Sequence, residues 1–343
     1  MKRESFGSRL GFILVSAGCA IGIGNVWKFP YICGAYGGAA FILIYLCFLV
    51  ILGIPVLVAE FAVGRGSHTS VAKCFDKLAP AGSGWKPLKF IGIIGCYMLM
   101  MFYTTVGGWM IYYCVKSLRG DFVGATPEAV TQSFSDMLGN APTMMLWMVI
   151  ICLIGFAVCF MGLQNGIEKI SKVMMSALLI IMVILAVHSV MMEGAGEGIS
   201  FYLIPDFQKI KEAGVGNVVF AALSQSFFTL SIGIGAMLIF GSYLDKSRSL
   251  TGEAVSITVL DTFVALTAGF IIIPACFSYG IQPDAGPSLI FITLPNIFAK
   301  MSGGALWGSL FFLFLTFAAV STIIAVFELS LIHISEPTRH SLI

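Results

Sequence analysis

Charged residues are scarce in this sequence. Only 10% of its 343 residues are charged, whereas 58% are hydrophobic, and the mean hydropathy is +0.98. A soluble domain carries about 25% charged residues. The composition therefore excludes an ordinary soluble domain and predicts a protein of the lipid bilayer. The net charge of +2 gives no indication of a basic binding surface, so we expect no nucleic-acid partner.

The chain also lacks the patterns of disulfide scaffolds, metal centres and common catalytic sites. It has four histidines and nine cysteines, and the cysteines lie mostly inside apolar runs without a CxxC or Cys/His pairing. We interpret them as small buried hydrophobic residues. No nucleophile, base and orienting group cluster in the sequence, and no phosphate-binding loop is present. We expect no enzyme activity.

Long apolar segments are abundant, and each is long enough to cross about 30 Å of hydrocarbon. The pattern predicts an all-α polytopic membrane protein. The first apolar run is too long for a signal peptide and lacks its small-residue cleavage site, so we expect no cleavable leader. The eight predicted spans are approximately 9–31, 36–65, 88–118, 143–161, 167–191, 214–243, 252–279 and 304–328.

Lysine and arginine are distributed unequally between the two sides of these spans. Twelve lie on one side: Lys2, Arg3, Arg9, Arg65, Lys73, Lys77, Lys86, Lys89, Lys169, Lys172, Lys246 and Arg248. Five lie on the other: Lys116, Arg119, Lys209, Lys211 and Lys300. We expect a cytoplasmic N-terminus in the cell's inner (plasma) membrane. The external segments 193–213 and 281–303 are then expected to be partly helical caps over the outer mouth.

The first span contains an unusual break. Residues 18–30 place three glycines and Asn25 where a lipid-spanning helix should still be running. A helix can break at membrane depth only where the freed backbone groups bind something, and such breaks occur at transporter ion and solute sites. The alternative is an intact helix in which Gly18 and Gly22 form a small-residue packing face.

The sixth span repeats this feature. Residues 225–235 place Gln, Ser, Thr and two glycines in the middle of the membrane. Two interrupted spans that are five apart are what an inverted repeat of five helices predicts, with the binding site where the two breaks meet. This correspondence favours the transporter interpretation over simple packing.

The chain resembles the neurotransmitter:sodium symporter family, in its bacterial amino-acid-transporting branch. The resemblance covers residues 3 to 328. It implies a sodium-coupled symporter of an apolar or aromatic amino acid that works by alternating access. The motifs that carry it, in order, are Arg3 and Phe6 with 9–12, 18–30, 37–41, 53–55 with Glu60 and 64–65, 164–169, 224–231, 291–295, and 321–322.

The resemblance implies two sodium sites built from oxygen ligands. The first would use the Ala20 carbonyl, the Asn25 side chain, the carbonyl and hydroxyl of Thr229, and Asp261, completed by the substrate carboxylate. The second would use the carbonyls of Gly18, Ile21 and Ala318 and the hydroxyls of Ser321 and Thr322. The alternative for these two hydroxyls is a hydrogen bond back to their own helix.

The resemblance also implies the substrate pocket. The freed amides of Ile23 and Gly24 would hold the carboxylate, helped by the Tyr103 hydroxyl. The amino group would face carbonyls near Ala20 and Phe228, with Ser231 beside them. Gly22 stands where monoamine-transporting relatives have Asp, and so leaves room for an amino acid; Ile234 replaces an aromatic residue. The side-chain slot would be lined by Leu99, Phe228, Ile234 and Val326.

Asp261 is an intramembrane carboxylate, and such groups are usually functional. Many relatives have Asn there, and animal members bind chloride close by. The matching positions here are Tyr45, Gln225, Thr229 and Asp261. A fixed charge at Asp261 could supply what chloride supplies elsewhere, or be protonated during the empty return step. We expect no chloride requirement.

Gating residues follow from the same resemblance. Arg3 and Phe6 match an inner latch. Lys28 stands where the family usually has Arg in an outer ion pair, and it keeps the charge without the bidentate fork.

Family members have more than eight spans. We therefore divide the chain into a transporter core, 1–328, with a first repeat of about 9–191 and an incomplete second repeat of about 214–328, and a tail, 329–343. The tail does not continue the family pattern and resembles the translation of a transposase adaptor used in building sequencing libraries, so we expect it to be non-native. The alternative function is a truncated, non-transporting fragment that at most binds ligand.

Overall fold

The computed structural model describes residues 6–281, 283 and 288–340, with the backbone alone for 329–340. Within these residues the chain is helical and contains no strand. The elements, in order, are α1 (Arg9–Ala20), η1 (Gly24–Lys28), α2 (Phe29–Ala35), α3 (Ala39–Phe48), η2 (Leu49–Gly53), α4 (Ile54–Ser67), α5 (Val71–Leu78), α6 (Leu88–Arg119), α7 (Pro127–Gly139), α8 (Ala141–Phe160), η3 (Leu163–Glu168), α9 (Lys169–Val190), α10 (Ala195–Leu203), α11 (Phe207–Ala213), α12 (Val215–Thr229), α13 (Ala236–Gly241), α14 (Leu250–Ser278), η4 (Leu289–Thr293), α15 (Leu294–Lys300) and α16 (Gly304–His340).

Six of the eight predicted spans are continuous helices that are long and apolar enough to cross a membrane. They are Ala39–Ser67, Leu88–Arg119, Ala141–Phe160, Leu163–Val190, Leu250–Ser278 and Gly304–Glu328. The first predicted span is a bent pair, Arg9–Ala20 and Gly24–Ala35, with 55° between its halves. The sixth is also divided, into α12 and α13. The predicted all-helical architecture with two broken helices is therefore confirmed.

The first break has a local cause. Ser8 caps α1 by accepting a hydrogen bond from the Gly11 amide, and the helix then runs to Ala20. Ile21 leaves helical geometry with ψ of 94°, and its amide still bonds to the Ala17 carbonyl at 2.6 Å. The chain resumes as the wide turn η1. The extended residue Ile21 and the bend at Gly22 therefore leave backbone groups without their usual helical partners, and these must be satisfied by other groups.

The second break is a turn between α12 and α13. Ser231, Gly233 and Gly235 have φ angles of 51°, 89° and 78°. Glycine reaches positive φ at little cost, whereas Ser231 adopts it against its usual preference. Strained backbone of this kind persists only where the surroundings hold it, and such positions cluster at functional sites.

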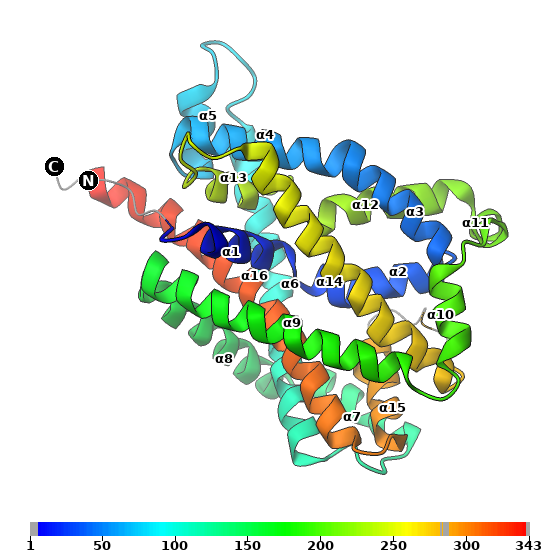
Figure 1. Cartoon of the computed structure of the whole chain (residues 1–343). Helices are drawn as coiled ribbons and strands as arrows, with labels where there is room; N and C mark the ends of the chain where they lie inside the picture. The colour runs from blue at the N-terminus through cyan, green and yellow to red at the C-terminus, as the bar shows by residue number, and fades with distance from the viewer. Residues whose placement is uncertain (1–5, 282, 284–287, 341–343) are drawn as a thin grey trace.

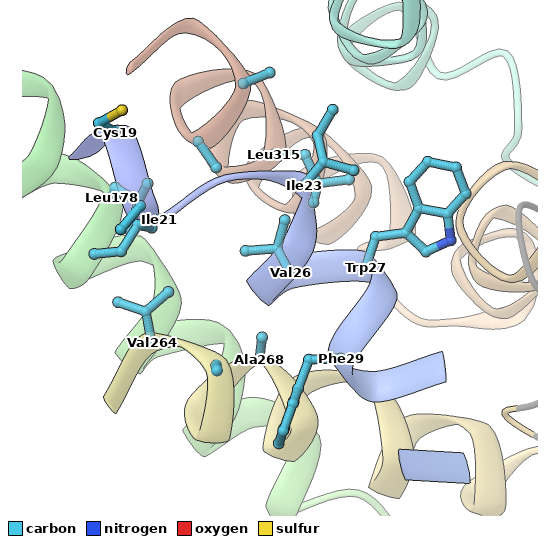
Figure 2. Packing of buried hydrophobic residues seen from close by; sticks show 14 of the residues in the cluster. Cys19, Ile21, Ile23, Val26, Trp27, Phe29, Leu178, Val264, Ala268 and Leu315 are labelled. Carbon is cyan, nitrogen blue, oxygen red and sulfur yellow. The ribbon is translucent and has the colours of Figure 1, made fainter. Parts of the chain in front are cut away.

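The two broken helices lie inside the bundle. In Figure 1, α1 and α2 run through the centre of the molecule, with α14 and α9 crossing beside them. α1 packs against α14, α9 and α16, while α12 packs against α3 and α13 against α4. Figure 2 shows Ile21 and Ile23 on either side of the break among apolar side chains of the neighbouring helices, including Leu178, Val264 and Leu315. The break is thus sealed from lipid by packed apolar residues.

The connecting segments contain more helix than the sequence indicated. The predicted caps at 193–213 and 281–303 contain α10, α11, η4 and α15, so their helical character is confirmed in the residues described. Two further short helices, α5 and α7, were not predicted. α7 is amphipathic, with Thr126 as its N-cap and Pro127 in its first turn. A search for long apolar runs misses helices of this type, which bury only one face.

The backbone of α16 stays helical to His340, through most of the predicted tail. Residues 341–343 lie outside the described part of the chain. The division of the chain into a core, two repeats and a non-native tail stays a prediction.

Candidate substrate and sodium site

The two helix breaks meet face to face. A Cβ added to Gly24 would lie 2.7 Å from the Phe228 ring, so the backbone of the first break touches the end of α12. The Gln225 side chain donates a hydrogen bond to the Gly24 carbonyl at 3.0 Å. The Ser231 hydroxyl, in the second break, donates to the Cys19 carbonyl at 3.1 Å. The breaks therefore satisfy some of each other's freed polar groups, and glycine is required where they approach most closely.

Three buried oxygen-bearing side chains converge beside this junction. The Asn25 amide nitrogen donates to the Thr229 hydroxyl at 3.0 Å and to an Asp261 carboxylate oxygen at 2.8 Å. The Thr229 hydroxyl donates to the other Asp261 oxygen at 2.8 Å. All three residues have an exposed fraction of 0%. Ala20, the fourth residue of the predicted first sodium site, is the buried last residue of α1.

A second group of oxygens lies between α1 and α16. The Ser321 hydroxyl is 3.4 Å from the Ile21 carbonyl and 2.9 Å from the Ala318 carbonyl. The Thr322 hydroxyl is 3.4 Å from the Gly18 carbonyl and 3.3 Å from the Ala318 carbonyl. All five residues of the predicted second sodium site are therefore brought together. Each hydroxyl bonds back to its own helix and also faces the first break.

Both groups are rich in oxygen atoms, although Asn25 presents its amide nitrogen to Thr229 and Asp261 and its oxygen to the Gly22 amide. Carbonyl, hydroxyl, amide and carboxylate oxygens suit a hard cation, whereas sulfur and imidazole suit softer metals. The first group carries a formal carboxylate and the second is neutral. The donor chemistry of both groups therefore fits sodium.

The freed amides of the first break face Tyr103 on α6. The Tyr103 hydroxyl lies close to the backbone amides of Gly24 and Ile23. A Cβ added to Gly22 would lie 2.8 Å from the same hydroxyl and 2.6 Å from the Thr322 hydroxyl. Gly22 therefore sits between the Tyr103 hydroxyl and the second oxygen group, and even an alanine there would displace a polar side chain.

A cavity of about 310 Å³ opens next to Tyr103. It is mostly apolar, and five of the predicted pocket residues line it: Leu99, Tyr103, Phe228, Ser231 and Ile234. Four more lining residues were not predicted: Gly95, Ser224, Phe227 and Ile232. Val326 is buried on α16 and is not among the residues that line this cavity. The polar rim and apolar wall suit a small molecule with one charged end.

Of the positions that match the chloride site of animal relatives, Thr229 bonds directly to Asp261. Tyr45 is fully buried on α3 and lies within electrostatic range of Asp261. Among the protein atoms described, the Gln225 side-chain oxygen is buried without a hydrogen-bond partner. The Asp261 carboxylate is held by Asn25 and Thr229 from the two broken helices.

The predicted gating residues lie in different surroundings. The Lys28 ammonium lies 4.1 Å above the Phe228 ring, a cation–π contact over the wall of the cavity. Phe6 packs edge-on against Tyr243, with 5.6 Å between ring centroids, at the end of the bundle where α1 begins. Arg3 lies outside the described residues.

Glu60 on α4 is a site residue whose role the sequence analysis missed. Its carboxylate accepts a hydrogen bond from the Gly233 amide at 2.6 Å and so holds the turn between α12 and α13. Its appearance inside a span whose other charged residue, Arg65, lies at the end was the signal that could have identified it, because carboxylates at membrane depth usually have a specific partner. Which partner it has depends on the turn geometry, which the sequence does not reveal.

Comparison with known proteins agrees with this geometry. The chain matches the family described as the Sodium:neurotransmitter symporter family over residues 3–127 and 121–342. It is 36% identical over 328 residues to the uncharacterized sodium-dependent transporter YhdH of Bacillus subtilis (strain 168), covering 96% of this chain and 72% of that protein. It is 29% identical to the sodium-dependent serotonin transporter of Drosophila melanogaster, covering 91% of this chain and 56% of that protein.

A solved structure shows the same fold. The crystal structure of MhsT in complex with L-phenylalanine superposes with a TM-score of 0.89 at 37% sequence identity, covering 98% of this chain and 76% of MhsT. The family match covers most of the chain, and the structural match includes both broken helices within the aligned region. The chain is a multi-pass membrane protein that belongs to the sodium:neurotransmitter symporter family, a family of transporters and not of enzymes.

Proposed function

We propose that this protein couples the inward movement of sodium to the uptake of an apolar or aromatic amino acid by alternating access. The observation that carries the proposal is the meeting of the two helix breaks. There, the backbone amides of the first break lie next to the Tyr103 hydroxyl, and a buried oxygen cluster follows them in the chain. Tyr103 also lines an apolar cavity.

The substrate is proposed to bind with its carboxylate on the amides of Ile23 and Gly24 and on the Tyr103 hydroxyl. Amides at a helix break carry partial positive charge that suits an anion. The side chain would occupy the cavity against Leu99 and Ile234, whose aliphatic surfaces favour apolar groups. The structure of MhsT is a complex with L-phenylalanine, which supports a substrate of this class.

Sodium is proposed as a co-transported ion at two sites. At the first, Asn25, Thr229, Asp261 and the Ala20 carbonyl would share the ion with the substrate carboxylate, so each would raise the affinity for the other. At the second, Ser321 and Thr322 of α16 would bind the ion together with carbonyls of the first break. Because this ion would tie α1 to α16, its release would free the two helices to separate.

Asp261 is proposed to replace the chloride that animal relatives use. It bonds to Thr229, one of the matching positions, and a carboxylate there disfavours a second anion close by. We therefore propose that transport proceeds without chloride.

We further propose that the protein resides in the plasma membrane with a cytoplasmic N-terminus, because Lys and Arg are more frequent on that side of the spans. The excess is twelve residues against five.

Equilibrium binding tests the substrate assignment. The purified chain should bind L-phenylalanine or L-leucine in sodium buffer and lose that binding in choline buffer. Tyr103→Phe should weaken binding roughly tenfold or more, because a hydrogen bond to a charged group contributes ~1.5–3 kcal/mol. The control is Tyr97→Phe on the same helix, where the side chain is 50% exposed and outside the cavity. Equal weakening by both variants would contradict the assignment.

A further inference from the structure

A second cavity lies far from the junction of the broken helices. It has a volume of about 370 Å³ and is enclosed by the end of α6, by α7 and by the start of α8. α6 and α8 are both membrane spans, and α7 connects them. The cavity therefore opens where two spans leave the hydrocarbon.

The cavity contains a preoriented cation. Lys116 is half-buried, and its ammonium donates to the Ser133 hydroxyl on α7 at 2.6 Å. The same ammonium lies 5.3 Å from the Tyr112 ring centroid and 5.6 Å from that of Phe122. These contacts hold the ammonium against the wall of the cavity, where it forms a point charge suited to a phosphate.

An acidic group faces the same cavity. Asp136 lies one helical turn beyond Ser133 on α7, and one of its oxygens accepts from the Gln132 amide at 2.7 Å. The cavity thus offers a cation and an anion on adjacent walls, with the hydroxyls of Tyr112 and Thr143 also in the lining. A ligand that carries a phosphate and an ammonium together would complement both charges.

An apolar helix face continues from the mouth of the cavity. Thr143 lines the cavity, and Leu146, Val149 and Leu153 follow it at spacings of three and four residues, so the four share one face of α8. These three side chains are 57%, 45% and 63% exposed. Trp147 lies beside the cavity, with its ring 5.8 Å from Tyr112. A ligand with an apolar tail would therefore find a lipid-facing surface directly below its head group.

We propose that this cavity binds the head group of an aminophospholipid, with phosphatidylethanolamine as the occupant. The phosphate would contact Lys116 and the adjoining hydroxyls, the primary ammonium would donate to Asp136, and an acyl chain would lie along the exposed face of α8. Basic pockets between membrane helices bind lipid head groups by this chemistry. A choline head group has no N–H to donate, and a glycerol head group has no positive charge for Asp136.

Quenching of tryptophan fluorescence by brominated lipids tests the proposal. The full chain is reconstituted in phosphatidylcholine vesicles that contain a small fraction of dibrominated phosphatidylethanolamine, phosphatidylglycerol or phosphatidylcholine. The difference between wild type and Trp147→Phe isolates the signal beside the cavity. We expect the ethanolamine lipid to quench this signal at up to about fivefold lower lipid fraction than the other two, the upper end of the range for exposed charge pairs.

Variants separate the two charges. Lys116→Ala should weaken quenching by all three lipids, and Asp136→Asn should reduce quenching by the ethanolamine lipid to the level of the glycerol lipid. Arg119→Ala is the matched control, because Arg119 is exposed on the same helix end and outside the lining. Asp136→Asn is isosteric and exposed, so folding should be preserved.

Three results would overturn the proposal. They are equal quenching of the Trp147 signal by the three brominated lipids, a preference that survives Asp136→Asn, and displacement of the lipid by soluble phosphoethanolamine at comparable concentration. The last would show that the cavity takes a free zwitterion and not a lipid. None of these results depends on sodium-coupled transport, so the cavity is tested independently of the proposed function.

Discussion

Gly22 shows how a single missing side chain shapes the site. Its Cα lies between the Tyr103 hydroxyl and the Thr322 hydroxyl, and a Cβ would approach both at less than 3.0 Å. Gly22→Ala should therefore lower substrate affinity roughly tenfold, because overpacking a filled site costs ~1–3 kcal/mol. Binding of L-phenylalanine in sodium buffer measures this.

The matched control for that variant is Gly216→Ala. Gly216 lies in the first turn of α12, where an added Cβ has no atom within 4 Å. The affinity of the Gly216→Ala variant for L-phenylalanine should equal that of wild type. If the Gly22→Ala and Gly216→Ala variants bind L-phenylalanine equally tightly, the inferred close packing around the first break is wrong.

Asp261 carries the second prediction at this scale. Asp261→Asn preserves the shape of the side chain and removes its charge, so transport should weaken in chloride-free buffer and recover when chloride is added. Wild-type transport should be the same with chloride or gluconate as the anion. Normal transport by Asp261→Asn without chloride, or a chloride requirement in wild type, would refute the proposed role.

Individual site residues were predictable to different degrees. Asn25, Thr229 and Asp261 stood out because polar groups are costly at membrane depth, and the structure places them in direct contact. The lining residues Phe227 and Ile232 were not predicted, because apolar residues beside a cavity look like any other core residue in a sequence. Only the packing of α6 against the turn after α12 distinguishes them.

At the scale of elements, the two breaks are held by contacts from intact helices. Glu60 of α4 accepts from the Gly233 amide and thereby fixes the turn that follows α12. The neighbouring residue Ser231 is held at positive φ, so this turn has little tolerance for movement.

Glu60→Gln is therefore expected to loosen the second break. The amide side chain keeps the shape but makes a weaker, uncharged hydrogen bond with the Gly233 N–H. Substrate affinity should fall several-fold. The shape of the curve of substrate binding against sodium concentration should be the same as in wild type. Hydrogen exchange of residues 230–235 should become faster. Unchanged exchange in this segment would contradict the positioning role.

The elements themselves were largely predictable, and the reason is physical. A span must be long and apolar, which the sequence displays directly. Breaks are visible because glycines and polar residues interrupt that pattern. The short helices α5 and α7 were not predicted because they lie outside the spans. There, amphipathic patterns are short and the hydropathy does not differ from that of a loop.

For the whole molecule, the charge distribution predicts the orientation. With Cys47 replaced by Ala, a cysteine at Glu212 in α11 should react with an impermeant maleimide added to intact cells. A cysteine at Lys86, before α6, should react only after permeabilisation. Both positions are exposed. The reverse labelling pattern would place the N-terminus outside and overturn the proposed orientation.

The central claim is sodium-coupled uptake at the junction of the two broken helices. Uptake of radiolabelled L-phenylalanine by proteoliposomes that contain the chain tests it most directly, with an inward sodium gradient compared with choline of equal ionic strength. The account predicts accumulation only with sodium, and its loss in Asn25→Ala and Thr229→Ala. Equal uptake in sodium and choline, or full sodium-driven uptake by both variants, would contradict it.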